Sequence, residues 1–232
     1  MDFSFLLADV ATGEPHVYAH WLLFGALYTA GIALAAMFLA LVLGTCLGVA
    51  RTLHGPVKWI ADGIFEVIRA VPFLAQCFAW FFVVPVLLFP EAIKSWNQNT
   101  YAVIAGTLAL GLFMSCRVAV QVYAGIQALP ASQLQAAKAL GFTTSQAYAR
   151  FLVPMAMRNI VPTLQSEAMN TVKNTAVLST IGVMELTRQA QSIVEFHSSP
   201  VEPFIAICII YLILNFLVLT GIKFIDTKIR LA

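Results

Sequence analysis

Apolar residues in this chain are gathered into long runs, which stretches rich in polar residues, proline and glycine separate. A helix that rises about 1.5 Å per residue needs about 20 residues to cross a hydrocarbon core of about 30 Å. The pattern therefore predicts an all-α membrane protein with a single domain over residues 1–232 and five transmembrane helices. The expected spans lie near residues 20–50, 59–89, 101–124, 159–182 and 203–224, and a loop over 125–158 joins the third to the fourth.

Composition supports this class. Hydrophobic residues make up 60% of the chain and charged residues 10%, whereas an average soluble domain has about 25% charged residues. The mean hydropathy is +0.86. The four cysteines lie in apolar segments without CxxC spacing, so we expect small hydrophobic side chains rather than a disulfide framework or a metal site.

Basic residues orient the spans, because the loops richest in Lys and Arg face the cytoplasm. One set of loops carries eight basic residues and the other carries two, Lys94 and Arg188. We therefore expect the N-terminus outside, and the 125–158 loop and the C-terminus inside. The eight residues are Arg51, Lys58, Lys138, Arg150, Arg158, Lys223, Lys228 and Arg230.

Two features within the spans predict special helix geometry. Pro72, in "EVIRAVPF", removes a backbone donor and disfavours a helical conformation at Val71, so the second span should be broken or kinked there. The break could line a cavity, or neighbouring helices could simply tolerate it. Gly44 and Gly48 form a GxxxG pair in the first span, which predicts close packing against another helix.

The cytoplasmic stretch "ASQLQAAKALGFTTSQAYARFLVP" is polar and has helix signals of its own. Ser132 with Gln135, and Thr143 with Gln146, have capping-box spacing, and Gly141 is a plausible helix stop between them. We expect two short helices that meet at Gly141, the second ending before Pro154, in a rigid corner for docking or a plain connecting loop. A DNA-binding helix-turn-helix is disfavoured, because the flanks enter the bilayer and few basic residues could contact phosphates.

The spacing of "QAAKALG", nine residues and "FLVP" resembles the EAA loop of the membrane subunits of bacterial ABC importers. Gln135 stands where that family usually has Glu. In the family this loop is a coupling helix that docks into a cytoplasmic ATPase, so the resemblance implies a coupling role for Gln135, Ala136, Ala137, Gly141 and Pro154. Phe151 and Val153 also fit the pattern.

Further stretches, "IRAVPFLAQ" (68–76) and "MNTVKNTAVLSTIGV" (169–183), resemble permeases of the polar amino acid uptake family, most of all those for glutamate and aspartate. This resemblance implies a location in the bacterial inner membrane and a translocation path of which this chain forms half. The implied partners are a cytoplasmic ABC ATPase dimer that binds ATP and Mg, a second permease subunit and an extracytoplasmic amino acid binding protein. Gln135 favours a heterodimer, since a similar subunit with the usual Glu could balance it.

Three basic residues, Arg69, Arg117 and Lys173, fall inside the expected spans. A charge facing lipid there costs at least about 2.5–3.5 kcal/mol, so each should face the bundle interior, a cavity or a partner. With Asn170 and Asn174 they could attract the carboxylates of an acidic amino acid.

The alternative for Arg69 and Lys173 is an internal salt bridge to Glu66 or Glu167, or hydrogen bonds to backbone carbonyls at the Pro72 break. For Arg117 we favour the substrate role, because its own span has no acidic residue. Many relatives have a Tyr, an Ala-Glu pair and an Arg where this chain has Arg117, Gln121 and Tyr123, which puts in doubt any transfer of contacts from carriers of basic amino acids.

The chain has no GxxxxGKS/T loop, GxGxxG fingerprint, nucleophile elbow or HExxH pair, so we expect no ATP site and no catalytic site. The alternatives are a permease for another polar amino acid and a secondary transporter driven by an ion gradient. The outer segment 183–203 could meet the binding protein, cover the outer mouth of the path or be a solvated loop.

Overall fold

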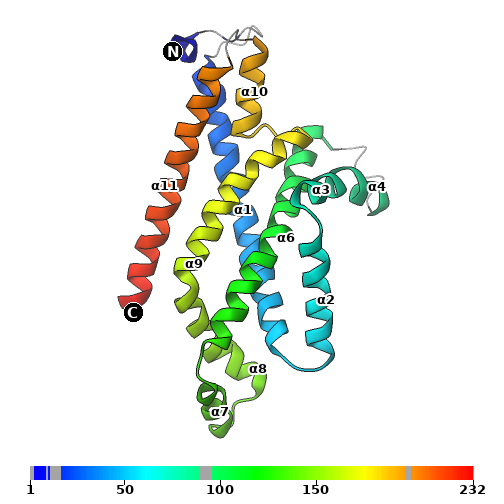
Figure 1. Cartoon of the computed structure of the whole chain (residues 1–232), viewed down its shortest axis with the longest axis vertical. Helices are drawn as coiled ribbons and strands as arrows, with labels where there is room; N and C mark the ends of the chain where they lie inside the picture. The colour runs from blue at the N-terminus through cyan, green and yellow to red at the C-terminus, as the bar shows by residue number, and fades with distance from the viewer. Residues whose placement is uncertain (1–2, 9, 11–16, 89–95, 197–199, 232) are drawn as a thin grey trace. The chain divides into compact units, whose positions relative to one another are not determined.

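The structure is a computed structural model, and it describes all residues except 1–2, 9, 11–16, 89–95, 197–199 and 232. The described chain is almost entirely helical (Figure 1), as expected. Its longer helices are α1 (Tyr18–Thr52), α2 (Pro56–Ala70), α6 (Gln98–Gln127), α9 (Val153–Asn174), α10 (Leu186–Phe196) and α11 (Val201–Leu231). The shorter α-helices are α3 (Phe73–Phe78), α4 (Val84–Leu88), α7 (Ala131–Ala139) and α8 (Thr144–Ala147). The remaining turns are the 3-10 helices η1 (Ser4–Leu7) and η4 (Thr175–Ile181) and the π-helices η2 (Ala79–Val83) and η3 (Tyr148–Leu152).

Among the described residues, three helices are long and apolar enough to cross a membrane: α1, α6 and the part of α11 over Val201–Phe224. A fourth is reached if α2 and the helical segment Phe73–Leu88 count as one broken span. The polar helix α9, where the fourth span was expected, is not one of these. The chain is therefore a multi-helix membrane protein, and the count of five spans and their orientation stay predictions. Of the residues used for orientation, Lys94 lies outside the described part.

The predicted break at Pro72 is confirmed. Helix α2 ends at Ala70, and Val71 is extended, with φ −90° and ψ 125°. Proline clashes with a helical conformation of the residue before it, which accounts for the extended backbone. The next helix, α3, begins at Phe73, directly after the proline.

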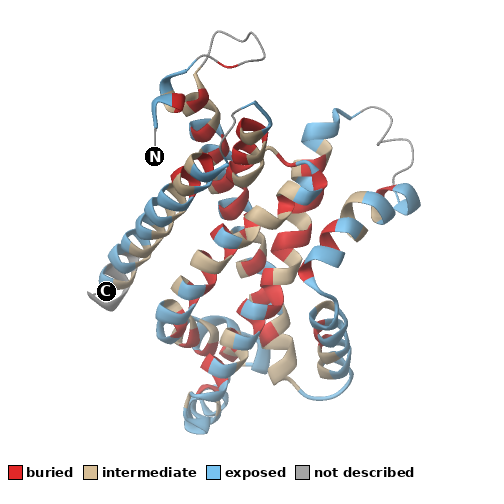
Figure 2. Cartoon of the chain, turned by 45° about the horizontal axis from the view of Figure 1, so that its top comes forward, coloured by how far each residue is buried: buried red, intermediate tan, exposed pale blue. Residues whose placement is uncertain are grey.

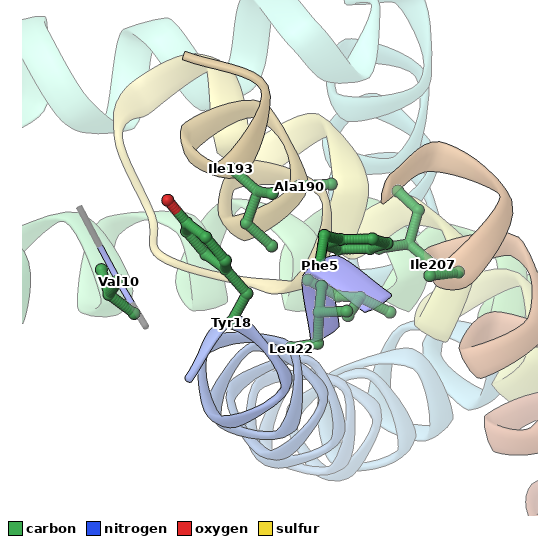
Figure 3. Close-up of a cluster of buried hydrophobic side chains, with 9 residues drawn as sticks. Phe5, Val10, Tyr18, Leu22, Ala190, Ile193 and Ile207 are labelled. Atoms are coloured by element: carbon green, nitrogen blue, oxygen red, sulfur yellow. The ribbon is translucent and has the colours of Figure 1, made fainter. Parts of the chain in front are cut away.

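The helices form two compact units. The first unit comprises residues 1–36, 73–110 and 169–217. A core cluster in it joins η1, α1, α10 and α11 through side chains that include Phe5, Leu22, Ile193 and Ile207 (Figure 3). Helix α10 buries Leu186, Ala190 and Ile193, which lie on one face because they are three or four residues apart.

Most of the outer segment 183–203, for which a solvated loop was one alternative, forms helix α10. Residues 197–199 of that segment lie outside the described part. Glu185, before its first turn, is fully buried. Its carboxylate accepts hydrogen bonds from the Arg188 backbone N–H (2.9 Å) and the Tyr211 hydroxyl (2.8 Å). The carboxylate thus satisfies a helix N-terminus and ties α10 to α11. Burial raises the pKa of Glu185, although these hydrogen bonds oppose the rise.

The second unit comprises residues 37–72, 111–168 and 218–232. In it the glycine pair of α1 lies against α6, which confirms the predicted close packing. A Cβ atom on Gly44 would lie 2.6 Å from the Ser115 carbonyl oxygen, and one on Gly48 would lie 2.8 Å from that of Ala119. Only glycine permits this approach. Much of α6 is buried, whereas α11 is exposed along most of its length (Figure 2).

Candidate functional site

The polar stretch forms a compact corner, residues 131–152, made of α7, α8 and η3 in the second unit. The expectation that Ser132 caps the first helix with Gln135 is wrong. Helix α7 begins earlier, at Ala131, and its N-cap is Pro130, which makes no side-chain capping bond. The Pro130 carbonyl accepts the Gln133 N–H at 3.0 Å. Proline has its φ angle already set for a helix start, so the first turn forms before Ser132 can act as a cap.

The predicted stop at Gly141 is confirmed. Gly141 has φ +86°, a left-handed conformation that is costly for residues with a Cβ atom. The N–H of Phe142 donates to the Ala137 carbonyl at 3.1 Å, and the N–H of Gly141 donates to that of Lys138 at 3.0 Å. This pair of bonds is a Schellman motif, which satisfies the last carbonyls of α7 and sets the direction in which the chain leaves.

The second helix begins as predicted but continues further. Thr143 and Gln146 form a reciprocal capping box: the Thr143 N–H donates to Gln146 Oε1 (2.9 Å), and the Gln146 N–H donates to Thr143 Oγ1 (3.3 Å). The expected end before Pro154 is wrong, because α8 passes through the π-helical turn η3 directly into α9, which includes Pro154. The altered bonding of a π turn lets a helix absorb a proline that has no N–H to donate.

The EAA-like residues divide between the inside and the surface of the corner. Ala137 is buried, and so is Ala147 of α8. Gln135 and Ala136 are exposed, and Leu140 at the end of α7 is 77% exposed. The rings of Phe142 and Phe151 meet edge to face, 5.1 Å apart. The corner is thus internally packed and presents one side of α7 outward.

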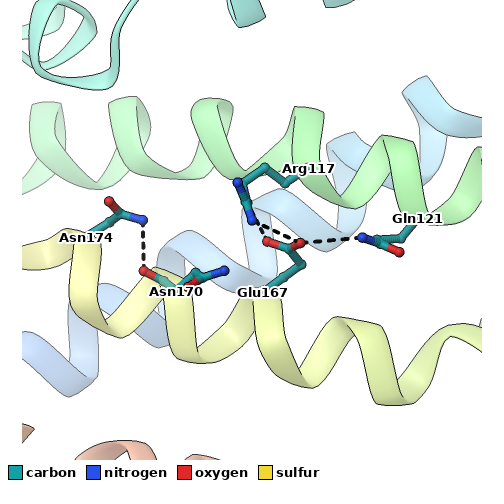
Figure 4. A network of polar contacts seen from close by, with 5 residues as sticks. All are labelled: Arg117, Gln121, Glu167, Asn170 and Asn174. Carbon is teal, nitrogen blue, oxygen red and sulfur yellow. Dashed lines mark hydrogen bonds and ion pairs between the residues drawn. The ribbon is translucent and has the colours of Figure 1, made fainter.

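The second candidate feature is an ion pair between α6 and α9. Arg117 Nε lies 2.5 Å from Glu167 Oε2, Arg117 Nη2 lies 3.3 Å from Oε1, and Gln121 Nε2 lies 3.5 Å from Oε1 (Figure 4). The side chain of Glu167 is 7% exposed and that of Arg117 is 44% exposed. The span of Arg117 has no acidic residue of its own, but this does not favour the substrate role, because the neutralising carboxylate comes from another helix.

This pair lines a cavity of about 430 Å³ within the second unit. Two arginines and one glutamate give the lining a formal charge of +1. Arg69 is exposed, and its guanidinium lies 5.8 Å from the ring centroid of Phe65. The full lining is Phe65, Arg69, Phe113, Cys116, Arg117, Val120, Gln121 and Glu167.

The other expected site residues belong to the first unit. Lys173 is exposed, and the Asn174 side chain donates to the Asn170 carbonyl at 2.9 Å (Figure 4). Neither Lys173 nor Arg69 forms an ion pair with any residue in the described part of the chain, so the alternative of an internal salt bridge for them is wrong. Glu167 is the residue that sequence reasoning assigned to the wrong partner. The available signal was that a lone arginine in a span needs a counter-charge on some other helix.

In the described residues, no group of three His, Cys, Asp or Glu side chains could hold a metal ion. Two of the cysteines, Cys77 and Cys116, are buried as expected, whereas Cys46 and Cys208 are exposed.

Comparison with known proteins places this geometry in context. The family described as "Binding-protein-dependent transport system inner membrane component" matches residues 36–231. The glutamate/aspartate import permease protein GltJ of Escherichia coli (strain K12) is 36% identical over 92% of this chain and 89% of its own length. The probable glutamine ABC transporter permease protein GlnM of Bacillus subtilis (strain 168) is 29% identical over 86% of this chain and 87% of its own.

Solved structures agree. A crystal structure of an amino acid ABC transporter with histidines matches with a TM-score of 0.75 and 28% identity, covering 91% of this chain and 95% of the other. An inward-facing structure of the MetNI methionine ABC transporter matches with the same TM-score at 17% identity, covering 91% and 97%. The second match bears on the fold alone.

Proposed function

The chain belongs to the family of binding-protein-dependent transport system inner membrane components, and we propose that it is the permease subunit of an ATP-driven importer for glutamate and aspartate. It forms half of the translocation path in a heterodimer with a similar subunit, and an extracytoplasmic binding protein delivers the substrate. A cytoplasmic ATPase dimer binds ATP and Mg. The N-terminus is outside the cell and the C-terminus inside.

The corner 131–152 carries this proposal. It is a rigid, exposed projection in a chain whose sequence has no nucleotide motif, and its turn is set by Gly141 with φ +86°. Such a projection can transmit force from a partner because its direction is set by local hydrogen bonds. Gln135, Ala136 and Leu140 offer the surface that docks into the ATPase, Ala137 and Gly141 maintain the shape behind it, and Pro154 lies where the corner enters α9.

The cavity beside Arg117 suits an acidic amino acid. At neutral pH such a substrate has two carboxylates and one ammonium group, hence a net charge of −1, and the cavity lining has the opposite formal charge of +1. Arg69 and Arg117 can bind carboxylates with paired N–H donors. The E. coli relative named for glutamate and aspartate import supports this assignment. Asn170, Lys173 and Asn174, at the end of α9 in the first unit, are further candidate polar contacts for the substrate.

A permease for another polar amino acid is the second candidate, which the relative named for glutamine favours. The test is uptake by proteoliposomes that contain this chain with its co-purified permease partner, ATPase and binding protein. We expect uptake of glutamate and aspartate only with internal ATP, and competition by glutamine that is weaker than by either acid. Preferred uptake of glutamine would favour the second candidate, and uptake without nucleotide would indicate a secondary transporter.

A second test addresses the cavity. Replacing Arg117 alone would leave the Glu167 carboxylate buried without its partner, at a cost of about 3–5 kcal/mol. The double variant Arg117→Gln/Glu167→Gln removes both charges together and keeps the side-chain bulk. We expect the double variant to assemble and to lose acidic substrate uptake, with Arg158→Gln on the exposed surface as the matched control. Normal uptake by the double variant would assign the pair a purely structural role.

A further inference from the structure

The corner is joined to the end of α1 by a hydrogen bond between side chains. The hydroxyl groups of Tyr148, in η3, and Thr52, the last residue of α1, are 3.2 Å apart. Thr52 Oγ1 also lies 2.7 Å from the Val49 carbonyl. Thr52 has one hydroxyl proton, so when that proton bonds Val49 the Tyr148 hydroxyl donates to Thr52. The corner and α1 are thereby connected at residues 96 positions apart in the sequence.

Arg51, the residue before Thr52, holds α1 against α2. Arg51 Nε lies 2.7 Å from Asp62 Oδ1, and the Arg51 guanidinium lies 3.7 Å from the centroid of the Phe65 ring. The ring centroid of Tyr123, on α6, lies 5.4 Å from the same guanidinium. The Arg51 side chain is only 17% exposed. An arginine combines a planar cation for aromatic faces with donors for a carboxylate, which a lysine does not.

Phe65 joins this arrangement to the polar cavity. Its side chain is 2% exposed and packs with Cys116 and Ala119 of α6. It also lines the cavity together with Arg69 and Arg117. Contacts therefore run without a gap from Tyr148 through Thr52, Arg51 and Phe65 to the cavity wall, all inside the second compact unit.

We propose that the Tyr148–Thr52 bond and the clasp of Arg51 on Asp62 and Phe65 act as one mechanical link between the corner and the cavity. Close-packed side chains transmit a displacement because the interior has little free volume to absorb it. When the corner moves, Tyr148 pulls on the end of α1, and Arg51 carries the movement to the α2 wall of the cavity. Arg51 is thus a positioning residue for transport. This inference rests on the proposed function, since it assumes that force enters at the corner.

Two substitutions interrupt the link at separate points. Tyr148→Phe removes one hydroxyl and keeps the ring, and Arg51→Gln removes the guanidinium. The measurement is the number of substrate molecules imported per ATP hydrolysed by the complete transporter in proteoliposomes. Coupling residues typically change such a linkage by about 0.5–2 kcal/mol, so we expect the ratio to fall by about 2- to 30-fold. Basal ATP hydrolysis should be unchanged in both variants. The apparent unfolding temperature should be unchanged in Tyr148→Phe, whereas Arg51→Gln should lower it because Asp62 loses its partner.

Each of the two substitutions has a matched control variant. Tyr28→Phe removes a hydroxyl from a side chain that is 44% exposed, and Lys58→Gln removes one positive charge from the first turn of α2. Neither should change the ratio. Arg51→Lys keeps the charge beside Asp62 but loses the planar contact with Phe65, so it should give an intermediate ratio.

The double variant Tyr148→Phe/Arg51→Gln distinguishes one link from two separate effects. We expect it to be no worse than the more affected single variant, because interrupting one link twice adds nothing. Full coupling in both single variants, or a loss in the double variant that equals the product of the two, would overturn the link. If the Arg51→Gln variant does not assemble, the ratios measured for Tyr148→Phe and Arg51→Lys still test the link. Failure of the proposed function looks different, since the wild-type complex would then show no ATP-dependent uptake.

Discussion

At Gly141 the chain turns from α7 into the segment that leads to α8. Gly141 has φ +86°, and a Cβ atom added there would meet nothing within 4 Å. Substitution therefore costs backbone energy alone, with no steric clash to confuse the result. The change tests whether the direction of the corner, rather than its composition, matters for coupling.

The expected magnitude follows from the backbone. A left-handed conformation costs a residue with a Cβ atom about 1–2 kcal/mol, and a β-branched residue more. If the turn opens to escape this cost, it loses the Phe142–Ala137 and Gly141–Lys138 backbone bonds, each worth about 0.5–1.5 kcal/mol. A shift of 1–2 kcal/mol changes a population by about 5- to 30-fold. We expect Gly141→Ala to reduce the correctly formed corner within this range and Gly141→Val to reduce it further.

The assay is again substrate imported per ATP by the reconstituted complex. Asn tolerates the left-handed region because its side chain can bond locally, so Gly141→Asn is the matched control. We expect coupling to fall in the order Gly, Asn, Ala, Val, while binding of the ATPase falls less than coupling does.

A different order would refute the reasoning. If Gly141→Val couples as well as the wild type, the left-handed turn is not needed and the corner is not a rigid projection. If Gly141→Asn is impaired more than Gly141→Val, the effect comes from side-chain contacts with the partner and not from backbone strain.

Two further predictions concern packing and pH. Gly44→Ala should lower the apparent unfolding temperature and weaken assembly, because its Cβ would lie 2.6 Å from the Ser115 carbonyl oxygen. The control Gly63→Ala, with open space around it, should leave both unchanged or improved. Equal effects at the two glycines would contradict close packing of α1 on α6. Burial raises the pKa of Glu185 above its usual 4.5, so the folded state holds this proton more tightly than the unfolded state. Stability should therefore fall as pH rises from about 4.5 through the raised pKa. Unfolding temperatures of wild type and Glu185→Gln, measured against pH in detergent, should diverge over this window, and parallel profiles would contradict the assignment.

The sequence by itself determined features that depend on local chemistry. Proline fixes its own φ and restricts its neighbour, so the break at Pro72 could be located to the residue. The helix stop at Gly141 and the Thr143–Gln146 capping box could also be predicted from the sequence, since each depends on interactions within a few residues. The pattern of apolar runs placed the long helices α1, α6 and α11, because length and hydropathy suffice to recognise such segments.

Local rules failed where two signals competed. Ser132 had capping-box spacing, but Pro130 started the helix first. Pro154 looked like a helix stop, but the π turn over Tyr148–Leu152 carried the chain into α9. In both cases neighbouring backbone geometry decided which signal acted.

Only the tertiary structure decided which charges meet. Arg117 and Glu167 are 50 residues apart in the sequence, and the sequence does not show whether Arg117 pairs with Glu167 or with another acidic residue such as Glu66. Arg51 likewise could be counted as a loop charge until the fold placed its guanidinium over Phe65. Side-chain partners on different helices depend on the rotation and depth of each helix, and these are set by packing contacts such as that of Gly44 on α6. No periodicity along one helix contains that information.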